Sequence, residues 1–391
     1  GRANDELFRF VRANVRVPDI VIGDFMAQVS SNELVKKRVL VFLEEMGLDD
    51  LEALGDQILI RSDEAVKSVI EKLPEGTYIG QIEADGDEEP IVIQTKIDVT
   101  PGEIAVDFTG TSMQSTRGIN VTFNWTYADT VHALLCAFRP DSPINAGSLK
   151  RFRVSAPPGC ILNAQYPAAV GARVLVAHHI QAAVFRALKD VMTGSILADS
   201  AAPTWVPVLS GINRYGQRFV EILIVHGGIG ARPHKDGIVI AYPDHPPTTA
   251  IEIFENEKPI LVEKKEFVID TAGAGRYRGG HGQVFAFKVQ GEHEVRLAMR
   301  ADRTKHPPLG FEGGSSGSCG VAVLNRSQNL HPKRTIFLKP GDHVMLQTPG
   351  GGGFYSPSKR HLEAIERDIE DEVLSIHKAR ESYGYSEGNN D

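Results

Sequence analysis

The segment Asp270–Gly282 (DTAGAGRYRGGHG) decides the fold class because of the elements that flank it. A strand pattern at Lys265–Asp270 leads into it, and another at Gln283–Val289 follows it directly. A dinucleotide-binding fingerprint needs a helix N-terminus after its glycines, where the pyrophosphate binds. The segment therefore predicts a glycine-rich connection between two strands, and it excludes a nucleotide-binding loop at this place.

The same alternation of strands and glycine-rich loops extends on both sides, from about residue 205 to about residue 348. Three further glycine-rich loops are present, at His226–Gly237, Gly310–Gly314 and Pro349–Tyr355. None ends in Gly-Lys-Ser/Thr, so none is a P-loop. The strands expected in this body are Phe219–Val225, Gly237–Ala241, Ala250–Phe254, Lys265–Asp270, Gln283–Val289, Val295–Arg300, Val321–Leu324 and His343–Leu346.

Helical patterns flank this body, and apolar periodicity predicts a mixed α+β protein. We expect a helical N-terminal segment (1–75), a mixed part (76–204), a mainly β body (205–355) and C-terminal helices with a tail (356–391). The expected helices are 4–15, 24–46 ending at Gly47, 49–54, 62–73, 123–138, 168–190 and a helical tail from Ser356 to Gly384; further strands are expected at 77–83, 90–99, 103–109 and 151–155.

Composition narrows the class of protein. The 391 residues carry a formal net charge of -8, which argues against nucleic-acid binding because that needs a basic surface. Three cysteines without a CxxC pair indicate a reducing compartment, so we expect a cytoplasmic protein. No apolar run is long enough to span a membrane. The start, Gly1–Glu6, has neither Met nor a signal pattern, which suggests a fragment or a processed chain.

Arginines gather in or beside the glycine-rich loops. Arginine forks bind carboxylates and phosphates through two parallel hydrogen bonds, which would suit a substrate or phosphate site. Structural ion pairs with nearby carboxylates such as Asp236, Asp270 or Asp302 would explain the presence of these arginines equally well. The arginines concerned are Arg232, Arg276, Arg278, Arg300 and Arg303.

The loop Pro349–Tyr355 (PGGGGFY) leads into the helix expected at Ser356. Exposed N–H groups of four glycines beside a helix N-terminus would suit an anion. A tight chain reversal with positive φ is the more frequent reason for such glycines. Asn120 poses a similar choice, because it follows a polar loop and precedes a helix. It could line a polar pocket or only cap that helix.

Histidine and cysteine patterns do not predict a metal site or a nucleophile. His178 and His179 are adjacent on an expected helix, where side chains diverge by about 100°. There is no HExxH motif, and no expected helix has two histidines four residues apart. Cys160 and Cys319 have no neighbour that would lower a thiol pKa, so structural roles are favoured.

Several strings in order resemble the hydantoinase B/oxoprolinase family, from about residue 10 to about residue 384. The ordered set is specific where a single glycine loop is not. The strings are Arg16–Pro18 with Gly23–Gln28, Val106–Thr111, Pro143–Gly147, Pro157–Asn163 with Tyr166–Val170, Gly273–Gly280 and Pro349–Tyr355.

The resemblance implies a subunit of an ATP-dependent enzyme that opens cyclic amides such as hydantoins, 5-oxoproline or lactams. It implies a hydantoinase A-type partner that binds ATP and Mg, with ATP phosphorylating the amide oxygen. Relatives carboxylate ketones such as acetone and acetophenone, so a ketone carboxylase subunit is an alternative. A non-catalytic scaffold that completes a partner's active site is another.

The family's His- and Asp-rich N-terminal portion, which looks like its metal-binding part, would precede this chain. We therefore expect a divalent metal to be bound outside these residues, possibly by a separate chain, and assign no metal ligand and no catalytic residue. Within the motifs, His281 stands where an apolar residue is common. The candidate substrate- or phosphate-binding residues are Arg232, Asp236, Arg276, Arg278, His281, Arg303, Asn120, Gly350, Gly351, Gly352 and Gly353.

Overall fold

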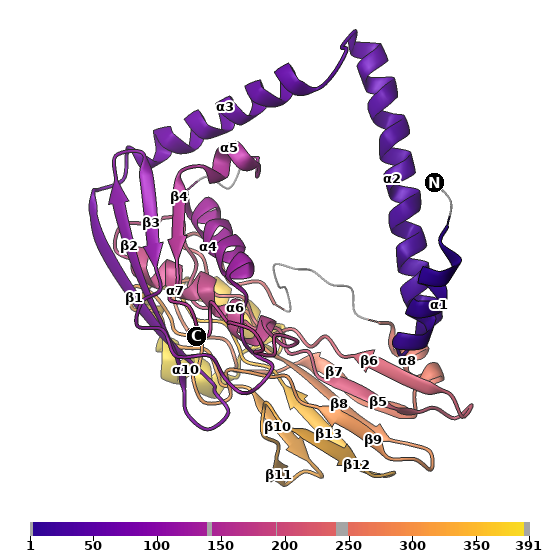
Figure 1. Cartoon of the computed structure of the whole chain (residues 1–391). Helices are drawn as coiled ribbons and strands as arrows, with labels where there is room; N and C mark the ends of the chain where they lie inside the picture. The colour runs from indigo at the N-terminus through magenta and orange to yellow at the C-terminus, as the bar shows by residue number, and fades with distance from the viewer. Residues whose placement is uncertain (1–2, 139–142, 193, 240–248, 387–391) are drawn as a thin grey trace.

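A computed structural model describes residues 3–138, 143–192, 194–239 and 249–386. Its first part is a helical arm, and Figure 1 shows α2 standing away from the rest of the chain, with α3 leading back to it. Asn4 caps the first helix, and Gly47 ends the second at a φ of 64°. The helices are α1 (Asp5–Asn14), α2 (Pro18–Met46) and α3 (Glu52–Ile70).

The expectation of two short helices at 49–54 and 62–73 is wrong, because α3 is continuous through that region. Gly55 lies inside it at a cost of about 1 kcal/mol, which the rest of the helix tolerates. Only the end of α3 is buried, at Ser62, Val66 and Ile70. The arm is therefore anchored to the body at one end of α3.

A four-stranded sheet follows, in the order β1-β2-β3-β4. Its first three strands are antiparallel, as the sequence predicts, and β4 joins β3 in parallel. Helices α4 and α7 pack together, and α7 lies on β1 and β2. The elements are β1 (Gly76–Ala84), β2 (Ile91–Thr100), β3 (Glu103–Asp107), α4 (Phe123–Phe138), α5 (Ala146–Leu149), β4 (Phe152–Ser155), α6 (Val174–Ala177) and α7 (His179–Leu188).

Two further sheets share a second core, which includes Trp205, Phe287 and Leu297. One runs in the order β11-β10-β13-β8-β7 and the other in the order β12-β9-β5-β6. The elements are β5 (Val208–Ile212), β6 (Arg218–Ile222), α8 (Ile251–Glu257), β7 (Ile260–Phe267), β8 (Gln283–Val289), β9 (Val295–Ala298), β10 (Val321–Leu324), β11 (Gln328–Asn329), β12 (Thr335–Leu338) and β13 (His343–Gln347).

Most of the expected strands are confirmed, but two expected strands and one expected helix need correction. Ala250–Phe254 belongs to helix α8, whose Phe254 packs into the second core. The helix expected at 168–190 is two short helices that begin only at Val174 and break at His178. The residues 237–239 form no strand, and the remainder of the expected strand Gly237–Ala241 lies outside the described residues.

Four glycine-rich segments pack together between the first sheet and the two further sheets, and we call them the bundle. They are residues 226–237, 270–282, 310–317 and 349–354. In its central segment, 349–354, each residue after Pro349 donates its backbone N–H to a different neighbouring segment. This is the pattern of extended chains with about three residues per turn and no internal hydrogen bonds. The N–H groups of Gly350, Gly351, Gly352, Gly353 and Phe354 donate to Ser318 Oγ and to the carbonyl oxygens of Gly280, Asp199, Ser315 and Tyr277, respectively.

The C-terminal residues form η1 (Pro357–Lys359), α9 (Leu362–Glu370) and α10 (Ile376–Tyr383). The expected C-terminal helices are present, but the cap expected at Ser356 is not formed. The Ser356 hydroxyl bonds to the hydroxyl of Ser358 instead, and only a short 3-10 turn follows. Ser375 and Gly384 cap α10 at its two ends.

Candidate functional site

The four glycines Gly350–Gly353 are buried, and neighbouring segments accept hydrogen bonds from all their N–H groups. The expected exposed anion loop is therefore not what the structure shows. None of the four has a positive φ, so a tight reversal is not the reason for them either. A Cβ on Gly350 would lie 1.9 Å from the Thr271 carbonyl oxygen, and one on Gly351 would lie 2.2 Å from that of Ile229. Close backbone approach requires these glycines.

A buried charge network lies on one side of the bundle, centred on Asp302. Its carboxylate accepts from Lys333 Nζ at 2.5 Å and contacts His179 Nε2 at 3.1 Å. All three side chains are almost fully buried. Burial would raise the pKa of Asp302, but the charge of Lys333 and the contact with His179 outweigh it and hold that pKa well below its ordinary value. Burial lowers the pKa of His179, which favours its neutral form.

Arg303 continues this network toward the bundle. It is 1% exposed and adopts a φ of 60°, a strained conformation for a side chain this large. Its Nε donates to the Ala202 carbonyl, and its Nη1 lies 3.7 Å from Asp199, which also pairs with Arg186. Its Nη2 is buried without a hydrogen-bond partner among the described residues. This orphan donor makes Arg303 a candidate ligand-binding residue.

Arg303 and Asp199 line a narrow crevice beside α7. Its other polar lining comes from His178, Gln181 and Ser200, so one wall is a helix and the other is the edge of the bundle. A guanidinium in such a crevice suits a carboxylate, a phosphate or a developing oxyanion. We take this crevice as the candidate functional site.

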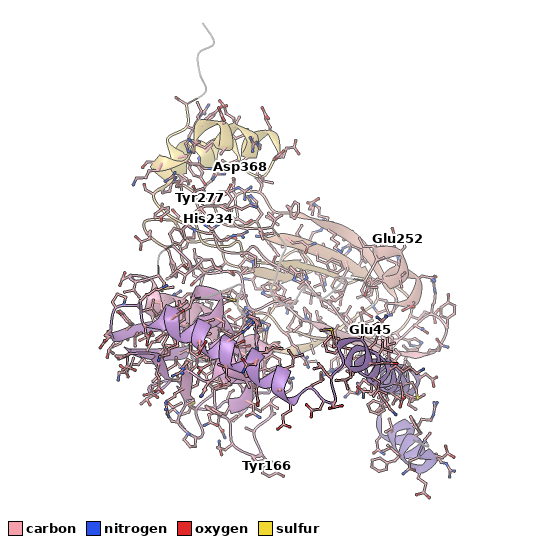
Figure 2. All side chains as sticks on the ribbon, turned by 90° about the horizontal axis from the view of Figure 1, so that it is seen from above. Glu45, Tyr166, His234, Glu252, Tyr277 and Asp368 are labelled. Atoms are coloured by element: carbon pink, nitrogen blue, oxygen red, sulfur yellow. The ribbon has the colours of Figure 1, made fainter. Side chains whose placement is uncertain are left out.

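A second charge network ties the C-terminal helices to the bundle. Arg360 is 8% exposed and pairs with both oxygens of Asp236, at 2.8 and 2.9 Å, and with Asp368 at 2.6 Å. The Arg278 guanidinium donates to the other oxygen of Asp368 at 3.0 Å, and the backbone N–H of Arg278 donates to the Asp236 carboxylate. Figure 2 shows Asp368 at the C-terminal helices, close to Tyr277 and His234 in that view. Asp236 and Arg278 are thus committed to ion pairs in the fold.

His281 is buried beside this second network, at 1% exposure, and neither ring nitrogen has a hydrogen-bond partner among the described residues. Burial, aided by the charge of Arg278, lowers its pKa to about 3. The unfolded chain would therefore bind the proton between about pH 6.5 and pH 3, and the fold loses stability as the pH falls through that window.

We predict that His281→Leu makes the chain more stable, and increasingly so at acidic pH. At pH 5 the gain should exceed that at pH 7 by about 2 kcal/mol, because the variant has no imidazole to protonate on unfolding. Urea unfolding at both pH values would measure the difference. The exposed His234→Leu serves as the matched control and should show no such change; equal gains at both pH values would contradict the prediction.

The remaining predicted residues lie apart. Asn120 is fully buried, and its side chain bonds to Ser115 and to the carbonyl of Ala169, so it fastens one loop to another. Arg276 lies over the ring of Tyr277 at 5.4 Å. Arg232 is half-buried in a turn, and its Nε has no hydrogen-bond partner among the residues that the structure describes. Of the predicted set, Asp236, Arg278 and His281 therefore gather at the second network, and Arg303 alone lies in the first.

Seven residues of the two networks are not among the predicted site residues: His179, Arg186, Asp199, Asp302, Lys333, Arg360 and Asp368. Arg360 lies only five positions after the loop Pro349–Tyr355 but outside every motif, and the others lie farther from the loops, so only the fold brings them together. Across the described ranges, no group of three or more His, Cys, Asp or Glu side chains is placed to hold a metal ion. The residues present therefore do not fit a complete metal site. Among the described helices, none has the length and apolarity to cross a bilayer.

The family model for hydantoinase B/oxoprolinase matches residues 1–357. An uncharacterized protein of Methanocaldococcus jannaschii is 33% identical over 390 residues, which is 98% of this chain and 68% of that protein. The putative B-type subunit of a D-/L-hydantoinase from a Pseudomonas strain is 27% identical over 408 residues, with the same two coverages.

Solved structures share the fold. The ATP-dependent caprolactamase of Pseudomonas jessenii superposes with a TM-score of 0.90 at 21% identity, covering 100% of this chain and 71% of that one. An acetone carboxylase in its nucleotide-free form gives a TM-score of 0.81 at 16% identity, covering 98% and 59%. The order of motifs, the mixed α+β fold and these matches agree, and the chain belongs to the hydantoinase B/oxoprolinase family.

Proposed function

We propose that this chain is a B-type subunit, or part of one, of an ATP-dependent enzyme that opens cyclic amides of the hydantoin, 5-oxoproline or lactam class. The observation that carries the proposal is its family membership, supported by the match to a caprolactamase over the whole chain. The relative named as a B-type hydantoinase subunit and the 5-oxoprolinases among the relatives support the same class of chemistry.

In this proposal the crevice at Arg303 receives the polar end of the substrate. Arg303 would donate its Nη2, which has no partner among the described residues, to the oxygen on which negative charge develops, while Asp199 and the Ala202 carbonyl hold the guanidinium in place. The chain has no P-loop, and the described residues offer no complete metal site. We therefore assign ATP and Mg to a hydantoinase A-type partner. Any further divalent metal would be bound by a part of the assembly outside these residues. We place the assembly in the cytoplasm.

The test is reconstitution with a hydantoinase A-type subunit and any companion chain that co-purifies. ATP hydrolysis should rise on adding a hydantoin, 5-oxoproline or caprolactam, and mass spectrometry should detect the ring-opened acid. No response to any cyclic amide, in an assembled complex that binds ATP, would overturn the proposal.

A ketone carboxylase subunit is the second candidate, favoured by the superposition with acetone carboxylase. The two candidates differ in their co-substrate. A carboxylase should consume ATP only with a ketone and bicarbonate, whereas a cyclic-amide hydrolase should work without bicarbonate. Omitting bicarbonate from the reconstituted assay therefore separates them.

We predict that Arg303→Lys lowers kcat/KM of the assembled enzyme by about 100-fold, the usual loss for one donor to a developing oxyanion. Lysine retains the charge but loses the fork. Steady-state kinetics would measure the effect, with native mass spectrometry of the complex as the assembly readout and Arg173→Lys as a half-buried control outside both networks. Full turnover with intact assembly would contradict a binding role, and loss of assembly alone would favour the scaffold alternative.

A further inference from the structure

The helical arm exposes an unusual amount of apolar surface. About half of the large apolar side chains that are exposed in the described residues lie between Leu7 and Ile60. Helix α2 has 29 residues and buries none of them. Figure 2 shows the arm, with Glu45 labelled, beside the body rather than within it. An exposed apolar surface of this extent marks a place where another polypeptide binds.

The apolar residues of α2 include a heptad seam. Starting at Val21, positions with alternating spacings of four and three residues lie on one face, the pattern of a coiled coil with one partner helix. In the middle of this seam stand two polar residues, Gln28 and Asn32, with Val35 after them. The seam reads Val21, Phe25, Gln28, Asn32, Val35, Val39, Phe42 and Met46.

The six seam positions from Val21 to Val39 are complementary to themselves when two copies run antiparallel, and Phe42 and Met46 then come opposite Pro18 and Asn14. One register places Phe25 opposite Val35 of the second copy, and Val21 opposite Val39. In the same register Gln28 faces Asn32, so the polar side chains meet each other and not an apolar residue. Beside the seam, Asp24 of each copy comes opposite Arg38 of the other. An interface in which each patch recognises its own copy is the kind that forms twofold dimers.

We propose that α2 pairs with α2 of a second copy of this chain as an antiparallel coiled coil in this register. The buried Gln28–Asn32 layer sets the register, as a polar residue in a coiled-coil core does, and the Asp24–Arg38 pairs add to it. On one side of the seam, Ile22 of each copy comes opposite Lys36 of the other. On that same side the twofold axis brings Val29 opposite Val29 of the second copy.

Disulfide trapping tests the register directly. Val29→Cys should give a disulfide-linked dimer on mild oxidation at micromolar concentration, because each Val29 meets its own copy. Leu40→Cys is the matched control: it is equally exposed on α2 but lies outside the seam, and it should stay monomeric on non-reducing gels. The unmodified chain controls for the native thiols Cys136, Cys160 and Cys319.

Charge reversal gives an independent measurement by sedimentation of the full chain. Arg38→Glu should weaken dimerisation by about tenfold, because two attractive pairs become repulsive. Adding Asp24→Arg should restore it, and Lys37→Glu on the opposite face should have no effect. Circular dichroism would check that each variant retains its helices.

Three results would overturn the proposal. These are a monomeric chain at micromolar concentration, as expected if a different polypeptide covers the arm; cross-linking at Leu40 but not at Val29; and a dimer that the paired charge reversal fails to restore. None of these results bears on the cyclic-amide activity, so the two proposals are tested separately.

Discussion

Asp302→Ala should lower the free energy of unfolding by about 3–5 kcal/mol, the usual cost of breaking a buried ion pair. Among the described residues, the variant leaves Lys333 Nζ with only the carbonyl of Ala301, at 3.4 Å, and it leaves His179 Nε2 without its carboxylate partner. The N–H groups of Arg303 and Asp85 lose their acceptor as well. Urea unfolding at pH 7 would measure the change.

The exposed pair Lys96–Asp98 provides the control, because it has a similar distance, 2.8 Å, but side chains that are 48% and 35% exposed. Asp98→Ala should cost less than about 1 kcal/mol. The pKa of Asp302 is depressed, so its contribution is present above the ordinary value of 3.8 and is lost as the pH falls below it. Equal losses in the two variants would mean that burial of the network does not govern its contribution.

Gly351→Ala should destabilise the fold by about 3 kcal/mol or more, at the upper end for added bulk in a packed interior. The new methyl group would meet backbone atoms of Ile229 and Gly230 at 2.2 to 2.8 Å, and backbone cannot rotate away as a side chain can. The central segment would have to shift, and with it the hydrogen bonds from Gly273 and to Gly280. The unfolding midpoint in urea would report the loss.

Gly171→Ala is the matched substitution, because a Cβ there meets nothing within 4 Å and its φ is not positive. It should leave the midpoint unchanged or raise it slightly. If Gly351→Ala were equally harmless, the bundle would have to be looser than the structure shows.

The local part of this fold could be predicted from sequence, and the long-range part could not. Short apolar runs between turn residues located β8 and β10 at their true bounds, although neither strand alternates in polarity and β8 is buried along nearly its whole length. The strand expected at Ala250–Phe254 failed, since a short apolar run suits a strand and a helix alike. At the site, sequence found Arg303 but not Asp199 or Lys333, which lie about 100 and 30 positions away along the chain. The sequence singled out Gly350–Gly353 for exposed N–H groups or a positive φ, whereas the structure requires them for close backbone approach.

The bundle also bears on how the protein is made. Its central segment, 349–354, is the last of its members in chain order, while Asp199 and Gly228, which bond to it directly, come at least 120 positions earlier. During synthesis these earlier segments leave the ribosome with their backbone groups unpaired, and contacts this distant along the chain form slowly. The first sheet can assemble while translation continues, whereas the glycine-rich segments must wait for nearly the whole chain. Chaperone demand should therefore concentrate in that interval of synthesis.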